Sequence, residues 1–172
     1  MPAKFAEKPA LRLSDPDENL DATGWNTENW DKITVPSNWQ TYLNEDGTRK
    51  YEEPIYTNQT LPWANYETVN TSTLLAPTVK NGVGHYQKTF TIPEGWEGRN
   101  IFISFQGVES AFYLWVDGQK VGYAEDSYTA DDFNITPYLN PELDVHTISV
   151  QVYRWSTGSY LENQDFIRLS GI

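Results

Sequence analysis

From residue 85 onward the chain consists of short hydrophobic stretches separated by polar breaks. Each stretch is rich in β-branched or aromatic residues and is bounded by Gly, Pro, Asn or Asp, which predicts β-strands. In the last stretch Ile148, Val150 and Val152 share one face, which is typical of a sheet with one buried side. The stretches are HYQKTFTI at 85–92, RNIFISF at 99–105, AFYLWVDGQKVGYAE at 111–125 and HTISVQVYRW at 146–155.

The turns and the first half of the chain complete this pattern. Asp117-Gly118 predicts a tight hairpin, because a type I′ turn needs positive φ at both central residues. Residues 1 to about 84 hold most of the prolines and show no sustained period, so we expect loops and short strands there. With no long amphipathic helix, the chain is expected to be all-β, an antiparallel sandwich or jelly roll over 30–172 after an irregular acidic segment at 1–29.

Composition limits the classes of protein to which the chain can belong. Its 172 residues fit one domain. The absence of cysteine excludes disulfides and thiolate chemistry and fits the cytoplasm, where we expect the protein to act. A net charge of -12 disfavours nucleic acid and anionic membranes as partners. Aromatic residues make up 15% of the chain; they suit a β-rich core, and some could form platforms for sugar rings.

Few residues show the spacing of a metal or catalytic site. The acidic loop at 125–132 could bind a divalent cation, although a solvated acidic loop explains it better. His85 and His146 lie far apart without paired ligands and are read as ordinary strand residues. Counting the 24 acidic residues does not decide whether a glycosidase pair of carboxylates is present, because such a pair is defined by its separation.

The stretch RWSTGSYLENQDF at 154–166 concentrates aromatic, charged and amide side chains near the end of the chain. Packing, ion pairing or bracing of the loop explains several of these side chains better than contact with a ligand does. These are Arg154, Trp155, Tyr160, Glu162, Phe166 and the nearby Arg168.

Six segments in collinear order resemble the N-terminal sugar-binding domain of glycoside hydrolase family 2 β-galactosidases. The resemblance covers about Trp30 to Ile172 and implies a galactose-binding-like jelly roll that packs against a catalytic barrel supplied by the rest of a longer chain. Both catalytic glutamates of the family's retaining mechanism lie in that barrel, so we expect no catalytic residue here. Family members continue past SGI, so the domain is expected to be truncated before its last strand. The segments are VPSNWQ (35–40), PIYTN (54–58), GHYQKTF (84–90), GVESAFYLWVDGQKVGY (107–123), FNITPYLN (133–140) and RWSTGSYLENQDFIRLSGI (154–172).

The resemblance assigns substrate binding to Asn58, which closes the P-x-Y-T-N motif, and to Asp165, the last residue of Y-L-E-x-Q-D. Amide and carboxylate groups suit directional hydrogen bonds to sugar hydroxyls. Asp165 is also implied in a sodium site that barrel residues complete, and the full-length enzyme is expected to use sodium and magnesium. Because both residues match positions that reach one sugar, we expect Asn58 and Asp165 to lie close together and exposed.

The resemblance also implies partners: galactosides such as lactose, the catalytic barrel, and further copies in a homo-oligomer. The length and content of the motifs favour a galactosidase over a β-glucuronidase or a mannosidase. Two other functions stay open. The chain could be a free-standing carbohydrate-binding module, or a subunit of a split enzyme whose catalytic partner is a separate chain.

Overall fold

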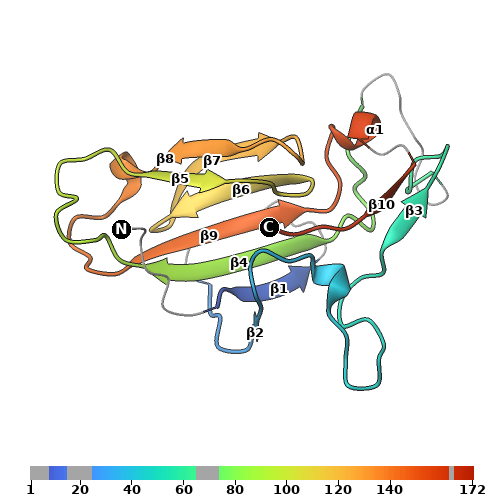
Figure 1. Ribbon diagram of the computed structural model, residues 1–172, viewed down its shortest axis with the longest axis horizontal. Coiled ribbons are helices and arrows are strands. Elements are labelled where there is room, and N and C mark those ends of the chain that lie inside the picture. The colour runs from blue at the N-terminus through green and yellow to red at the C-terminus, as the bar shows by residue number, and fades with distance from the viewer. Residues whose placement is uncertain (1–7, 15–24, 65–73, 163–164) are drawn as a thin grey trace.

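The hydrophobic stretches form strands in the computed structural model, which describes residues 8–14, 25–64, 74–162 and 165–172. The described helical structure is limited to α1 (Ser159–Glu162) and two 3-10 turns, and no helix in these ranges is long and apolar enough to cross a membrane. Figure 1 shows the strands: β1 (Ala10–Ser14), β2 (Asp31–Lys32), β3 (Ile55–Thr57), β4 (Val83–Phe90), β5 (Phe102–Phe105), β6 (Ala111–Val116), β7 (Gln119–Glu125), β8 (Asp131–Asn134), β9 (His146–Tyr153) and β10 (Phe166–Arg168).

A six-stranded antiparallel sheet, in the order β2-β1-β4-β9-β6-β7, forms the larger layer. As predicted, Ile148, Val150 and Val152 of β9 face the core and are 7%, 4% and 0% exposed. The prediction of a sheet with one buried side is wrong at this strand, because Ser149 and Gln151 on the other face are also buried. β9 is a central strand, so neighbours cover both of its faces.

The segment before β2 covers part of the outer face of this sheet. The rings of Trp25 and Trp30 lie 5.1 and 6.3 Å from the ring of His85 on β4. Gln87 of the same strand donates a hydrogen bond from Nε2 to Oγ of Ser149, 3.1 Å away. Gln87 and Ser149 on the outer face therefore satisfy each other, and aromatic rings shield His85 from solvent.

The structure departs from the expected irregular segment at 1–29, because β1 lies between β2 and β4 in the large sheet. The sequence ALRLS alternates as a half-buried strand should, with Leu11 buried and Arg12 exposed. Residues 1–7 and 15–24 of that segment lie outside the described residues. The sandwich therefore takes in at least five residues that precede the expected boundary at residue 30.

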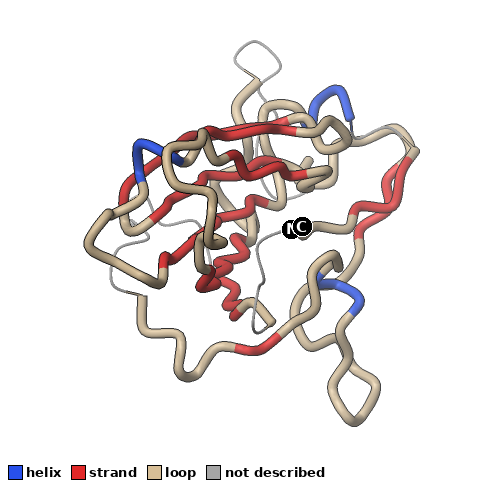
Figure 2. The backbone as a smooth tube through the Cα atoms, turned by 60° about the vertical axis from the view of Figure 1, so that its left-hand side comes forward, coloured by secondary structure: helices blue, strands red, loops and turns tan. Residues whose placement is uncertain are grey.

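The strands β5 and β8 pair with each other and form a second layer over the inner face of the large sheet. Loops and turns connect most of the strands (Figure 2). The ring of Phe112 on β6 lies 4.7 Å from Phe105 of β5 and 5.8 Å from Phe133 of β8. Aromatic rings at such distances fill much of the space between two sheets. The expected all-β, antiparallel jelly-roll class is confirmed.

A groove of about 250 Å³ lies between the layers, with Ile103, Ile148 and Ile172 among its mainly apolar lining residues. The hydroxyl of Tyr86, which also lines it, is buried without a hydrogen-bond partner among the described residues. Within that part of the chain β5 pairs with β8 alone. The expectation that the domain lacks a last strand stays a prediction.

The predicted hairpin joins β6 to β7, with φ of 48° at Asp117 and 78° at Gly118. The Asp117 carboxylate accepts hydrogen bonds from the backbone N–H groups of Thr147 (2.7 Å) and Asn140 (3.0 Å), and it pairs with Nδ1 of His146 at 2.7 Å. Burial alone would raise the pKa of Asp117, but these hydrogen bonds and the pairing with His146 outweigh it and lower the pKa.

This carboxylate should make the stability of the domain depend on pH in the acid range. A lowered pKa in the folded state contributes stability that is fully present above the unfolded value of about 3.9 and is lost as pH falls through the folded value. We expect Asp117→Asn to flatten the fall in unfolding free energy below about pH 4, measured by urea denaturation. Asp144→Asn, at an exposed position, controls for the loss of one charge; equal flattening in both variants would contradict the assignment.

Candidate functional site

Two short strands, β3 and β10, bring the two predicted substrate-binding residues together. They pair antiparallel, with Ile167 opposite Tyr56 and Phe166 opposite Thr57. One further step of this register places Asp165 opposite Asn58. Figure 1 shows the pair beyond one end of the large sheet, beside α1. The strands thus hold Asn58 and Asp165, both exposed, at the same end of a small ribbon.

The hydroxyl of Tyr56 lies between these two side chains. It donates a hydrogen bond of 2.5 Å to Oδ1 of Asp165, and the side chain of Asn58 lies near enough to affect the pKa of Tyr56. The hydrogen bond to Asp165 raises the pKa of Tyr56, and Asn58 acts in the opposite direction. Tyr56 is 57% exposed, so this polar trio of Asn58, Tyr56 and Asp165 faces solvent.

Sequence reasoning did not identify Tyr56, although the P-x-Y-T-N motif contains it. The available signal was its position two residues before Asn58, because alternate residues of a strand project to the same side. Asp165 has a φ of 50°, in the left-handed region that Asp tolerates better than most residues. In this backbone conformation the Asp165 carboxylate accepts the hydrogen bond from Tyr56.

Exposed apolar side chains lie next to the polar trio. Phe166 and Ile167 of β10 are 47% and 56% exposed, and Leu161 of α1 is 83% exposed. The ring of Phe166 meets that of Tyr128 edge-on at 6.0 Å. Contiguous exposed apolar surface is typical of a face that contacts another protein surface or a ligand. We call Tyr128, Leu161, Phe166 and Ile167 the apolar rim.

Three residues of the 154–166 stretch pack as the structural interpretation predicted. Trp155 is 1% exposed, and its ring lies 5.4 Å from that of Trp63, which in turn lies 5.4 Å from that of Tyr160. Arg154 forms an ion pair with Glu52, with Nη1 and Oε2 3.1 Å apart. None of these side chains is available as a platform for a sugar. Asn163 and Gln164 lie outside the described residues.

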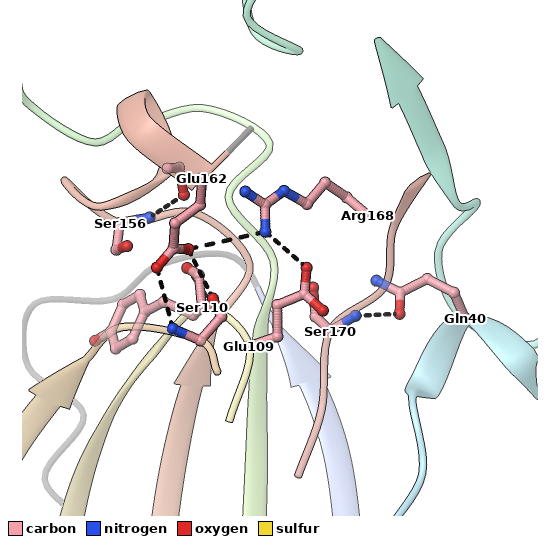
Figure 3. Close-up of polar contacts among 10 residues, drawn as sticks. Gln40, Glu109, Ser110, Ser156, Glu162, Arg168 and Ser170 are labelled. Carbon is pink, nitrogen blue, oxygen red and sulfur yellow. Dashed lines mark hydrogen bonds and ion pairs between the residues drawn. The ribbon is translucent and has the colours of Figure 1, made fainter. Parts of the chain in front are cut away.

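Glu162 and Arg168 belong to a mostly buried ionic network (Figure 3). Nη1 of Arg168 lies 2.9 Å from Oε1 of Glu109 and 3.8 Å from Oε2 of Glu162. Glu162 also accepts hydrogen bonds from the backbone N–H (3.0 Å) and hydroxyl (2.7 Å) of Ser127. Burial raises the pKa of Glu109, and the hydrogen bond and charge of Arg168 oppose that rise. The predicted bracing role of Glu162 and ion pairing of Arg168 agree with this geometry.

The carboxylates of the described residues do not assemble a metal site by themselves. No group of three or more His, Asp or Glu side chains in this part of the chain is arranged to hold an ion. In the acidic loop, partial burial and then the neighbouring Asp126 and Asp132 raise the pKa of Asp131. One carboxylate oxygen of Asp165 does not accept the hydrogen bond from Tyr56. This oxygen could bind a hard cation if other groups supplied the remaining ligands.

Comparison with known proteins gives consistent matches along the chain. Residues 8–172 match the family described as "Glycosyl hydrolases family 2, sugar binding domain". The chain is 48% identical over 168 residues to a β-galactosidase of Priestia megaterium, a match that covers 98% of this chain and 15% of that protein. It is 38% identical over 181 residues to the β-galactosidase large subunit of Leuconostoc lactis, covering 98% of this chain and 26% of that subunit.

Solved structures show the same fold. A β-glucuronidase of Bacteroides uniformis matches 99% of this chain and 17% of its own with a TM-score of 0.62 and 21% identity. A β-glycosidase from Bacteroides vulgatus matches 98% of this chain and 19% of its own with a TM-score of 0.63 and 20% identity. At this identity the likeness supports the jelly-roll architecture alone.

Proposed function

We propose, because this chain belongs to the family of sugar-binding domains of family 2 glycosyl hydrolases, that it is the N-terminal domain of a β-galactosidase and supplies one side of the galactose site. The observation that carries this proposal is the convergence of Asn58 and Asp165 on one exposed hydroxyl, that of Tyr56. Packing of the core alone does not require two polar side chains so distant in sequence to lie close together. The β-galactosidase relatives, at 48% and 38% identity, support the choice of galactoside as substrate.

In this proposal the polar trio binds and orients the sugar, and the bond-breaking chemistry takes place on residues outside this chain. Asp165 accepts hydrogen bonds from sugar hydroxyls, and the Asn58 amide donates and accepts in fixed directions. A charged acceptor gives the stronger hydrogen bond, so Asp165 provides more of the orientation. The galactose hydroxyls replace the hydroxyl of Tyr56 as partners of Asp165, or share the carboxylate with it.

The same surface is where we expect a sodium ion and the catalytic domain to bind. Asp165 would supply one carboxylate oxygen to a sodium ion, and ligands from the catalytic domain would complete the site. Magnesium, also expected for the full-length enzyme, is assigned no ligand in this chain. The apolar rim would be covered by the catalytic domain, which would bury Phe166 and Ile167 and exclude water from the sugar.

The rival functions fit the observations less well. A free-standing carbohydrate-binding module must bind a sugar with its own residues. The polar trio lies on an open surface, where its hydrogen bonds to a sugar would replace hydrogen bonds to water and would hardly offset the cost of immobilising the sugar. The L. lactis relative bears on whether this domain is a separate subunit of a split enzyme. The region that this chain matches makes up 26% of that large subunit. In that protein the matching region is therefore part of a longer chain.

The isolated chain should not hydrolyse β-galactosides. We expect no turnover of a chromogenic β-galactoside above the rate in buffer, and turnover by the full-length protein, with a β-glucuronide as the comparison substrate. The reason is that the proposal assigns the polar trio to binding alone. Turnover by the isolated chain that persists through purification, and that disappears when one of its own Asp or Glu residues is replaced, would contradict the proposal.

A further inference from the structure

Hydrophobic burial cannot hold β10 in place. Phe166 and Ile167, two of its three residues, are about half exposed, and its partner strand β3 exposes Tyr56. A two-stranded pair of this length is marginal in water without additional packing. The one side chain of β10 that is buried is Arg168, at 2% exposure. Whatever fixes β10 must therefore act largely through Arg168.

The guanidinium group of Arg168 has the contacts that such an anchor requires. Its Nη1 lies 2.9 Å from Glu109 and 3.8 Å from Glu162, and both carboxylates are themselves mostly buried. Glu162 is fixed in turn by two hydrogen bonds from Ser127. Charges that are buried, paired and hydrogen-bonded hold a specific geometry, because losing one partner leaves the other charge buried and unpaired.

The positions of these residues in the chain relate the network to Asp165. Glu162 precedes Asp165 by three residues and Arg168 follows it by three, and the side chains of Glu162 and Arg168 point toward each other (Figure 3). The ion pair therefore joins two residues that flank Asp165 at equal distances along the chain. We propose that Arg168, with Glu109 and Glu162, is a positioning residue that holds Asp165 in register with Asn58. For its meaning in catalysis this inference rests on the proposed function.

Other hydrogen bonds hold the residues that follow Arg168, so loss of the Arg168 side chain should disturb the structure only nearby. The N–H of Ser170 donates to Oε1 of Gln40 at 2.7 Å, and the N–H of Trp39 donates to the carbonyl of Ser170 at 3.0 Å. Gly171 and Glu109 exchange backbone hydrogen bonds of 3.1 and 3.3 Å. We therefore expect a change at Arg168 to release the segment that includes Asp165 and to leave the C-terminal residues paired.

The test uses this chain and requires no sugar. NMR with ¹³Cζ-labelled tyrosine follows the titration of Tyr56, assigned with Tyr56→Phe, and cross-strand contacts between Tyr56 and Ile167 are recorded at neutral pH. In Arg168→Met we expect the pKa of Tyr56 to fall toward the value in Asp165→Asn, which lacks the carboxylate. We also expect the cross-strand contacts to weaken, whereas Arg168→Lys should restore both in part. A folded Arg168→Met variant with an unchanged Tyr56 titration and unchanged contacts would overturn the proposal.

A second variant decides the matter if Arg168→Met does not fold. Glu162→Ala removes the pairing with Arg168 and the two hydrogen bonds from Ser127, and it leaves the Arg168–Glu109 pair intact. We expect it to lower the pKa of Tyr56 by a smaller amount in the same direction. An unchanged value in this variant would overturn the proposal.

The outcome is separable from that of the proposed function. If the full-length protein proves not to bind galactose at this site, the Tyr56 readout still shows whether Arg168 positions Asp165. If Tyr56 is unaffected by the loss of Arg168 while galactose binding is confirmed, the positioning role fails and the proposed function stands.

Discussion

Replacement of Asp165 by asparagine in the full-length protein should lower kcat/KM for a β-galactoside about 10- to 150-fold, because a hydrogen bond to a charged group contributes about 1.5–3 kcal/mol. Asparagine has nearly the same shape and tolerates the positive φ of this position, so the backbone should be preserved. The change removes the negative charge, which serves both the sugar and the proposed sodium ion. Steady-state kinetics with a chromogenic substrate measure the loss.

A matched variant distinguishes a specific effect of Asp165 on substrate binding from a general effect of removing one negative charge. Asp46→Asn alters an exposed aspartate in the turn between Asn44 and Thr48, where its carboxylate accepts hydrogen bonds from Thr48. We expect this variant to keep kcat/KM within about twofold of the unaltered enzyme, as is usual for a surface change away from a site. Equal losses at Asp46 and Asp165 would show that Asp165 has no special part in substrate binding.

Removal of the Trp155 side chain should destabilise the isolated domain by about 3–5 kcal/mol, as large-to-small changes of buried Trp do. Trp155 is 1% exposed and lies against Trp63, so alanine leaves a cavity between the sandwich and the segment that includes α1. A loss of this size is a large fraction of the total stability of a domain, about 5–15 kcal/mol. Urea unfolding followed by far-UV circular dichroism measures the change.

Tyr128→Ala is the control for this prediction, because Tyr128 is also aromatic but is 61% exposed. We expect it to change the free energy of unfolding by less than about 1 kcal/mol, since little surface is returned to water. If Trp155→Ala and Tyr128→Ala have similar effects, Trp155 is not part of the packed core, and the assignment of the aromatic cluster to packing is wrong.

The sequence predicted most of the sandwich because its strands are long and periodic. The stretches that became β4, β6, β7 and β9 each alternate or are bounded by turn residues, and the hairpin at Asp117 follows from local turn chemistry. The strand β1 was missed because ALRLS is short and precedes the acidic run SDPDENLD. The outer face of β9 was misjudged because polar residues such as Gln151 are typical of exposed positions, and burial there depends on distant neighbours.

The candidate site was accessible only through the resemblance. Tyr56 and Asp165 are separated by 109 positions, and no local pattern predicts that two three-residue strands will pair. Register between short strands depends on the surrounding fold, which periodicity does not encode. Ion pairing of Arg168 and bracing by Glu162 were predicted from the sequence, but the burial of these charges was not, because a charged residue is normally expected at the surface.

The most direct test of the central claim is the structure of the full-length protein with galactose bound. The proposed function predicts that the Asp165 carboxylate and the Asn58 amide each lie within hydrogen-bonding distance, about 2.5–3.2 Å, of hydroxyls of the same sugar. It also predicts that the apolar rim is covered by the catalytic domain. A sugar bound elsewhere, with Asn58 and Asp165 both left facing solvent, would contradict the claim that this domain supplies one side of the galactose site.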